Sequence, residues 1–204
     1  MKKNLAVLMA VLALAVLASC GQSVVVPANT ISPADLTDDQ KEIVELLSIP
    51  SQNEIVLFDF DIDDSYRSIE VWVELYKNGE QSDRLAMLHT IRNDTVNIPG
   101  KGHLAIMIRH DPELNWTLSL SYDGSRSSYS TSEGYAIDPD PGWGRAFGPM
   151  NGAVAIEDGK EIVLYSSVYN EGGLAAYDAQ YYQEHPEVLG DYAFVHLIKA
   201  RFSK

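Results

Sequence analysis

Apolar and polar residues alternate with a period of two along much of the chain. Over 69–77 the apolar residues Ile69, Val71, Val73 and Leu75 fall on one side, and Glu70, Trp72, Glu74 and Tyr76 fall on the other. The same alternation runs over 54–62, 104–108, 116–122 and 192–202. Such alternation is typical of antiparallel strands that bury one face and expose the other.

Turn-forming dipeptides separate several of these runs. Asn78-Gly79, Asp123-Gly124 and Asp158-Gly159 each stand between strand-like segments. Asn, Asp and Gly tolerate the positive φ angles of two-residue hairpin turns, so we expect three hairpins at these positions. The Pro- and Gly-rich stretch 138–144 is incompatible with a regular strand or helix, and it predicts a loop.

One helix is predicted near the start of the folded region. Thr37 and Gln40 have the spacing of a capping box, and Ile43, Val44 and Leu47 then share one helical face. Pro50 marks the end of this run, and we expect the apolar face to pack on the strands that follow. Over 174–189 a strand-like alternation and a helical turn ending at Gly190 remain alternatives.

The pattern as a whole predicts a mainly β protein. We expect an antiparallel β-sandwich with one N-terminal α-helix and a short helical element late in the chain. No strand–helix–strand rhythm and no internal repeat is visible in the sequence. The folded part is expected to form a single β-rich domain over 35–204, since a chain of this length buries enough surface without disulfides.

The first twenty residues have a different pattern. Lys2 and Lys3 precede an apolar run over 5–17, too short at about 20 Å of helix to cross the hydrocarbon core of a bilayer. A charged start, a short apolar run and small residues at its end are typical of a secretory signal peptide. A weak membrane helix, or a plain signal with an incidental cysteine, is the alternative.

Leu17-Ala18-Ser19-Cys20 fills each position of a lipobox, so the N-terminus resembles a bacterial lipoprotein signal. The resemblance implies a signal peptide over 1–19, cleavage before Cys20, and a diacylglyceryl anchor with fatty chains such as palmitate on the Cys20 thiol. Residues 20–34 would then be the lipidated cysteine and its tether. Cys20 is the single cysteine of the chain, so its lipidation would leave no thiol for a disulfide, a nucleophile or a metal site.

The mature region also resembles small lipoproteins of Gram-positive bacteria. The resemblance rests on a helix of the 36–47 kind after the lipobox, on the motifs Tyr177-Asp178-Ala179-Gln180-Tyr181-Tyr182 and His185-Pro186-Glu187, and on a final strand. It implies an extracytoplasmic location, at the cell surface or facing the periplasm, with no catalytic residue to transfer.

The chain is strongly acidic, with a formal net charge of −14. Such a surface repels phosphate backbones and anionic headgroups, and no basic stripe with interleaved aromatic residues is present. Nucleic acid is therefore excluded as a partner. Membrane association would come from the lipid anchor.

Asp59, Asp61, Asp63 and Glu70 have the spacing of positions 1, 3, 5 and 12 of a calcium loop. Position 6 is Asp64 in place of the usual Gly, and the flanks predict strands where an EF-hand has helices. The alternatives are weak Ca²⁺ or Mg²⁺ affinity at the 61–65 turn and a solvated acidic turn. No other cofactor is expected.

Motifs for zinc or nucleophilic catalysis are absent from the sequence. No two histidines have the i, i+4 spacing of a zinc protease helix, and neither Gly-x-Ser-x-Gly nor Ser-x-x-Lys occurs. His196 alternates with Phe194 and Ile198, and His89 follows Leu85 and Met87, so both are expected as core or semi-buried residues and not as metal ligands.

Three aromatic residues are candidates for ligand contact. Trp143 lies among Pro and Gly residues, and Trp72 and Tyr76 share the polar side of their strand with Glu70 and Glu74. Aromatic faces beside carboxylates suit sugar rings and protein interfaces. In the alternative, Trp72 and Tyr76 lie under the 37–48 helix and Trp143 closes one end of the sandwich.

These observations favour a lipid-anchored extracytoplasmic module that binds a glycan or a protein at the cell envelope. An envelope-polymer hydrolase with paired carboxylates, and an accessory lipoprotein of a membrane complex, are the two alternatives. The hydrolase needs two carboxyl groups about 5 to 9.5 Å apart across a cleft.

Overall fold

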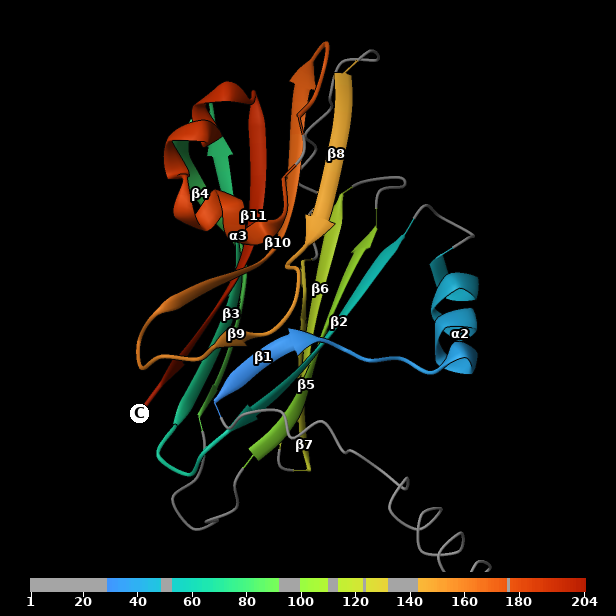
Figure 1. Cartoon of the computed structure of the whole chain (residues 1–204), viewed down its shortest axis with the longest axis vertical. Coiled ribbons are helices and arrows are strands. Elements are labelled where there is room, and N and C mark those ends of the chain that lie inside the picture. The colour runs from blue at the N-terminus through green and yellow to red at the C-terminus, as the bar shows by residue number, and fades with distance from the viewer. Residues whose placement is uncertain are drawn as a thin grey trace, which may run out of the picture.

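The computed structural model describes residues 29–48, 53–91, 100–109, 114–122, 124–131, 143–175 and 177–204. Within these ranges the strands form two antiparallel sheets that pack face to face (Figure 1). The first sheet has the order β7 (Ser125–Ser130), β6 (Asn115–Tyr122), β5 (Gly100–Arg109), β2 (Glu54–Ile62), β1 (Thr30–Pro33) and β9 (Val154–Ala155). The second has the order β4 (Glu80–Ile91), β3 (Ser68–Lys77), β11 (Phe194–Ser203), β10 (Glu161–Glu171) and β8 (Trp143–Pro149).

The predicted β-sandwich is therefore confirmed. The apolar side chains of the alternating segments fill the space between the sheets, because one side of each strand faces the opposite sheet. Phe60 contacts Phe202 of the other sheet, with ring centroids 5.4 Å apart. Gly102 makes room for the Phe60 ring, since a Cβ atom at this position would lie only 2.1 Å from it.

Within the described ranges three short helical segments accompany the sheets: α2 (Asp38–Ser48), α3 (Ala179–Glu184) and the 3₁₀ helix η2 (Pro186–Asp191). The capping box predicted for α2 is present. The Thr37 backbone N–H donates to Gln40 Oε1 at 2.9 Å, and the Gln40 N–H donates to Thr37 Oγ1 at 3.3 Å. The ambiguous 174–189 segment contains α3 and the start of η2, so its late part is helical.

The hairpin predictions have different outcomes. Asn78 and Gly79 have φ angles of 50° and 82° and connect β3 to β4 as expected. Tyr122 pairs with Ser125, so β6 and β7 form the second hairpin, although Asp123 itself lies outside the described residues. The hairpin predicted at Asp158-Gly159 is not formed. This turn leads from β9 in the first sheet to β10 in the second.

Two boundary predictions are also wrong. Residues 30–33 were expected in the tether, yet they form β1, which pairs with β2 and β9 and buries Ile31 completely. The domain thus begins before residue 35. Trp143 and Gly144 were expected in a loop, but they begin β8, where Trp143 pairs with Glu171 of β10. The rest of that loop, 138–142, lies outside the described residues.

A register shift explains why His89 is not in the core. Val73 pairs with Ala86 and Glu74 pairs with Arg84, which leaves Leu85 as an extra residue in β4. The bulge reverses the alternation after Leu85 and turns His89 outward, opposite Glu70. His196 is fully buried as predicted, and its ring lies 5.1 Å from that of Trp116.

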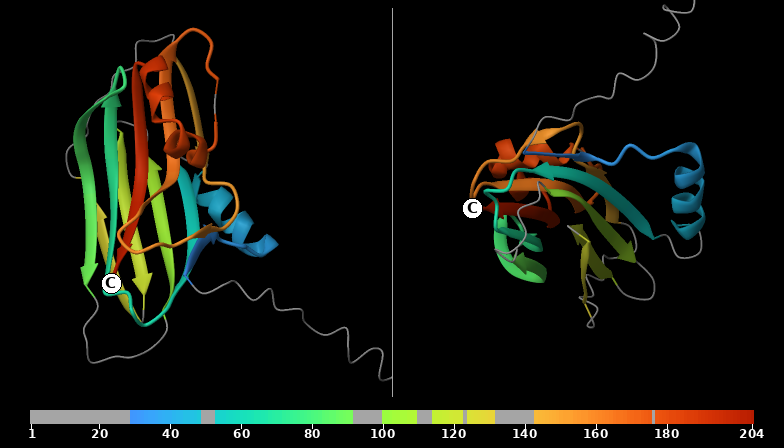
Figure 2. Two further views of the ribbon diagram at one scale, coloured as in Figure 1. Left: turned by 60° about the vertical axis from the view of Figure 1, so that its left-hand side comes forward. Right: turned by 90° about the horizontal axis from the view of Figure 1, so that it is seen from below.

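α3 and η2 lie against the outer surface of the second sheet (Figure 2). A second register shift interrupts β10 between Val163 and Tyr165. The side chain of Gln183 in α3 bonds the polar groups of this irregular backbone. Its Oε1 accepts from the Val163 N–H at 2.8 Å, and its Nε2 donates to the Glu161 carbonyl at 2.9 Å. At the other end, Gly79 of the β3–β4 turn approaches Gly190 of η2 so closely that a side chain at Gly79 would collide with it.

α2 does not pack as the sequence predicted. None of its residues is buried, and it projects from the first sheet, where it contacts β2 (Figures 1 and 2). The expected contact between its apolar face and the strands is therefore wrong, while Pro50 lies outside the described residues. Among the described residues no helix has the length and apolar character needed to cross a membrane.

Candidate functional site

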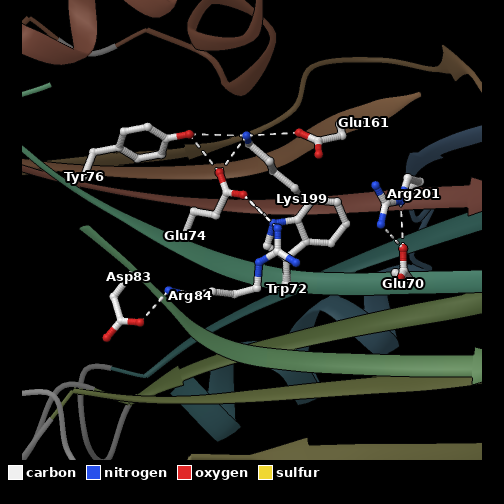
Figure 3. A network of polar contacts seen from close by, with 9 residues as sticks. All are labelled: Glu70, Trp72, Glu74, Tyr76, Asp83, Arg84, Glu161, Lys199 and Arg201. Carbon is white, nitrogen blue, oxygen red and sulfur yellow. Dashed lines mark hydrogen bonds and ion pairs between the residues drawn. The ribbon is translucent and has the colours of Figure 1, made fainter. Parts of the chain in front are cut away.

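Trp72 and Tyr76 lie together on the outer face of the second sheet, as the alternation of β3 predicts. Both side chains converge on Glu74 (Figure 3). Trp72 Nε1 donates to Glu74 Oε1 at 2.8 Å, and Tyr76 Oη donates to Glu74 Oε2 at 2.8 Å. The three aromatic and acidic side chains therefore form one hydrogen-bonded group.

Two cations complete this group. Lys199 of β11 places its Nζ 2.7 Å from Glu74 Oε2, and Arg84 of β4 places Nη2 3.3 Å from Glu74 Oε1. Lys199 also contacts Glu161 Oε2 at 3.2 Å, which ties β10 to the same network (Figure 3). Glu74 is only 3% exposed, and its carboxylate is matched by donors from three strands. We call Trp72, Glu74, Tyr76, Arg84 and Lys199 the Glu74 network.

The environment shifts the proton affinities of these groups. Burial by itself would raise the pKa of Glu74, but hydrogen bonds from Lys199, Trp72 and Tyr76 outweigh burial and hold the pKa below its ordinary value. Burial and the Glu74 carboxylate raise the pKa of Tyr76. Burial would lower the pKa of Lys199, yet its bond to Glu74 raises it. Lys199 therefore remains protonated, and Tyr76 remains a neutral donor.

Trp72 is not accessible to a ligand. Its side chain is 1% exposed, with the guanidinium of Arg84 at 4.8 Å and that of Arg201 at 5.5 Å from its ring. Arg201 in turn pairs with Glu70. This burial does not support the predicted role of Trp72 in ligand contact, and its physical cause is the pair of arginines over the ring. The alternative cover by α2 does not occur either, since α2 contacts β2.

Beside Tyr76 there is a small cavity of about 160 Å³ between the sheet and the α3–η2 segment. Tyr76 and Lys199 line it on the sheet side, and Tyr182 and Pro186 line it on the helical side. The polar groups on its sheet side are already engaged, since both Tyr76 and Lys199 are bonded to Glu74. The Glu74 network is thus best understood as an internal support of the second sheet.

Trp143 is half-buried at the start of β8. Its ring packs on Phe194 of β11, with centroids 5.5 Å apart, and its Nε1 is buried without a hydrogen-bond partner among the described residues. Trp72 therefore offers no free aromatic face for stacking on a sugar, and the half-buried Trp143 ring is packed against Phe194. Of the three aromatic candidates, Tyr76 alone lines a cavity described here.

The four residues of the calcium-loop pattern are distributed over two strands and a turn. Asp59 Oδ1 lies 2.7 Å from His103 Nδ1, Asp61 is opposite Lys101, and Glu70 is paired with Arg201. Asp63 accepts from the Ser65 N–H and from Asn29 Nδ2, each at 2.8 Å. Bonds from Ser65 and Asn29 lower the pKa of Asp63 to about 2. The described residues contain no group of three or more His, Cys, Asp and Glu that could hold a metal ion.

Sequence reasoning missed a second polar cluster that joins the two sheets. Glu54, at the start of β2, forms an ion pair with Arg145 of β8 and a hydrogen bond with Tyr165 of β10. Arg145 Nε also donates to Ser167 Oγ at 3.3 Å. Burial and the Glu54 carboxylate raise the pKa of Tyr165. No spacing rule brings residues 54, 145 and 165 together, so only the folded chain reveals this contact.

Three of the exposed large apolar residues lie together on α2. Ile43, Leu46 and Leu47 are 57%, 60% and 57% exposed. Because 3.6 residues make one turn, these side chains lie on one side of the helix, and Lys41 and Glu45 lie on the other. We call Ile43, Leu46 and Leu47 the α2 stripe. It is a surface that water solvates poorly and that a partner could cover.

The chain belongs to the YgaN domain family, whose model matches residues 30–202. The match begins at β1 and ends in β11, so it spans both sheets and includes the segment first assigned to the tether. A search of curated proteins and a search of solved structures found no match to the chain.

Proposed function

We propose that this chain is a non-catalytic binding domain, held outside the cytoplasm by a lipid on Cys20, and that it binds a protein partner through the α2 stripe. The anchor part rests on the lipobox residues 17–20, which lie outside the described residues. The observation that carries the binding part is a capped helix with three large apolar side chains and no buried residue.

The α2 stripe is energetically suited to a contact. Covering a fully exposed Leu or Ile side chain contributes about 1.5–3 kcal/mol, and three neighbouring ones form the centre of a small interface. The Thr37–Gln40 capping box holds the first turn of α2 in place. A partner would therefore meet a helix that is already formed, which reduces the entropy lost on binding.

Charge indicates which kind of partner fits. Asp38, Asp39, Glu42 and Glu45 surround the stripe, and Lys41 is the single basic residue of α2. An acidic helix is repelled by anionic lipid headgroups, whereas helices that lie on membranes carry Lys and Arg beside their apolar face. A second copy of the same acidic chain is repelled in the same way. The fitting partner is a protein with an apolar groove bordered by basic side chains.

The anchor would keep this partner close to the membrane. Cys20 and Thr30 are ten positions apart. An extended chain spans at most about 3.6 Å per residue, so β1 would lie within about 36 Å of the lipidated residue. The partner of α2 is therefore expected to be a membrane protein with a basic extracytoplasmic surface. This corresponds to the accessory role among the functions that the sequence left open.

Site-specific photocrosslinking in cells tests the binding part. A photoreactive residue in place of Leu47 should yield one discrete crosslinked product, and the same residue in place of Lys41, on the opposite side of α2, should yield much less. Leu47→Asp should abolish binding to the identified partner, while Lys41→Gln, which changes the net charge equally, should preserve it. Salt should weaken the complex. Equal crosslinking from both positions, products only with lipid or a second copy, or no product would reject the proposal.

Detergent partitioning tests the anchor separately. The wild-type chain should enter the detergent phase with a mass that includes fatty chains and begins at Cys20. Cys20→Ala should remain in the aqueous phase with its fold unchanged. An unmodified thiol at Cys20 would reject the anchor, and the crosslinking result would still decide the role of α2.

A further inference from the structure

A second surface, on the outer face of the first sheet, has the opposite character to the rest of this acidic chain. β5, β6 and β7 contain Lys101, Arg109 and Arg126 and not one Asp or Glu, although the whole chain has 29 acidic residues. Acidic residues lie beside these strands: on β2, Asp59 is held by His103 and Asp61 is opposite Lys101, and Asp35 lines a neighbouring hollow with them. The three strands therefore form a locally basic area.

A hollow of about 260 Å³ lies in this area. The strand register places His103, Ser121 and Arg126 in one row across β5, β6 and β7, and Ala105, Ser119 and Ser128 in the next row. The two rows are about 7 Å apart along the strands. All six residues line the hollow, so small side chains form its floor and His103 and Arg126 stand at two sides.

The donors around the hollow are suited to an oxyanion. Arg126 is exposed and forms no ion pair within the part of the chain that the structure describes. Asp59 holds His103 through Nδ1 at 2.7 Å, which fixes the ring and leaves Nε2 for another partner. The hydroxyls of Ser119 and Ser128 are 3.1 Å apart. One proton serves that bond, so the pair keeps a second proton to donate.

The geometry points to this hollow as a binding site for a phosphate group carried by a small hydroxylated molecule or polymer. Arginine and hydroxyl donors recognise the phosphate oxygens, and polar floor residues can accept from neighbouring hydroxyls of the ligand. The volume suits one phosphorylated polyol unit better than a drug-sized ligand. The site involves none of the α2 residues, so its test is independent of the test of the proposed protein contact.

Calorimetry on the full mature chain in detergent tests the site. The probes are inorganic phosphate, sn-glycerol 3-phosphate, poly(glycerol phosphate) and neutral glycerol. An ionic strength near 0.15 M is chosen because its Debye length of about 8 Å screens the distant acidic residues. We expect saturable binding of glycerol phosphate, and no binding of glycerol. Tighter binding of the polymer would indicate an envelope polymer as the source, and equal binding per phosphate would indicate a soluble metabolite.

Variants distinguish binding at this hollow from nonspecific electrostatic attraction to positive charge. Arg126→Ala should weaken binding by about tenfold, since one charge-assisted contact is lost. Ser119→Val, which fills the floor without changing charge, should weaken it comparably. Arg109→Ala removes the same charge on the same face, six residues and about 20 Å along β5 from His103, and should leave binding unchanged. Equal loss in Arg109→Ala, full binding in Arg126→Ala, equal affinity for glycerol, or no binding of any probe would overturn the inference.

Discussion

The outer faces of the two sheets have similar alternating sequences and different physical states. On the second sheet, Arg84, Lys199 and Arg201 each have a carboxylate partner, and Trp72 and Glu74 are almost completely buried. On the first sheet, Arg109 and Arg126 have no ion pair among the described residues, and small hydroxyl side chains leave hollows. The polar face of the second sheet therefore contributes to stability, whereas that of the first sheet keeps charged donors available for a ligand.

The two faces differ in how much hydration each carboxylate or cation loses when the chain folds. A buried ion must regain in the protein the interactions that it gave up in water, so the Glu74 network is complete. An exposed cation such as Arg126 keeps its hydration and needs no partner for stability. Unpaired and exposed donors are therefore free to bind a ligand without weakening the fold.

Among the substitutions considered for the two faces, removal of the Glu74 carboxylate should lower the stability of the domain most. Glu74→Ala leaves Lys199 half-buried with a weaker set of partners and leaves the Trp72 indole without its acceptor. Breaking a buried ion pair costs about 3–5 kcal/mol. For a domain of this size each kcal/mol lowers Tm by about 2–4 °C, so we expect a decrease of about 10 °C by calorimetry.

The double variant Glu74→Leu with Lys199→Met is the matched control. An apolar pair removes both charges together, so much of the lost stability should return. A Tm change below about 1 °C in Glu74→Ala, or a double variant as unstable as the single one, would show that the network is not a support of the fold.

Low pH should also reduce the stability of the domain, because protonation removes the charge of the Glu74 carboxylate. The pKa of Glu74 is lowered in the folded state from an ordinary value of 4.5, because donors from Lys199, Trp72 and Tyr76 outweigh its burial. A lowered pKa contributes stability above the ordinary value, and this contribution is lost as the pH falls through the folded-state pKa. Asp63, with an ordinary value of 3.8 and a folded-state pKa of about 2, adds a further loss over that interval.

Urea unfolding at pH 7, 4 and 3 measures this dependence. The free energy of unfolding should fall between pH 7 and pH 3. In Asp63→Asn the decrease should be smaller, since the titrating group is absent. An unfolding free energy that stays constant from pH 7 to pH 3 would contradict both assignments.

A smaller contrast is expected between two arginines on opposite faces. Arg201 is partly buried beside Glu70, with Nε 2.7 Å from Glu70 Oε2, and it covers the Trp72 ring. Arg201→Ala should therefore lower the free energy of unfolding by about 1 kcal/mol. Arg126→Ala should change it by less than about 0.5 kcal/mol, the usual range for exposed substitutions. Equal losses in denaturant titrations would remove the proposed distinction between the faces.

The strands with clear alternation, β2, β3, β5, β6 and β11, could be predicted, whereas β1, the start of β8 and the candidate sites could not. Side-chain alternation placed the buried faces of β2 and β3, and the spacing of Thr37 and Gln40 located the start of α2. Alternation failed at His89, where one extra residue in β4 reverses the two faces. It also placed Trp72 on an outer face correctly, but it could not show that Arg84 and Arg201 cover the ring.

Local sequence was sufficient for the strands with clear alternation, the capped helix, two of the hairpins and the acidic character of the chain, because these depend on neighbouring residues or on composition. Tertiary structure alone decided which polar face is covered, where Glu54 meets Arg145, and that α2 buries none of its residues. The reason is that such contacts join residues far apart in the chain. Their formation depends on sheet order and register, which no local pattern encodes.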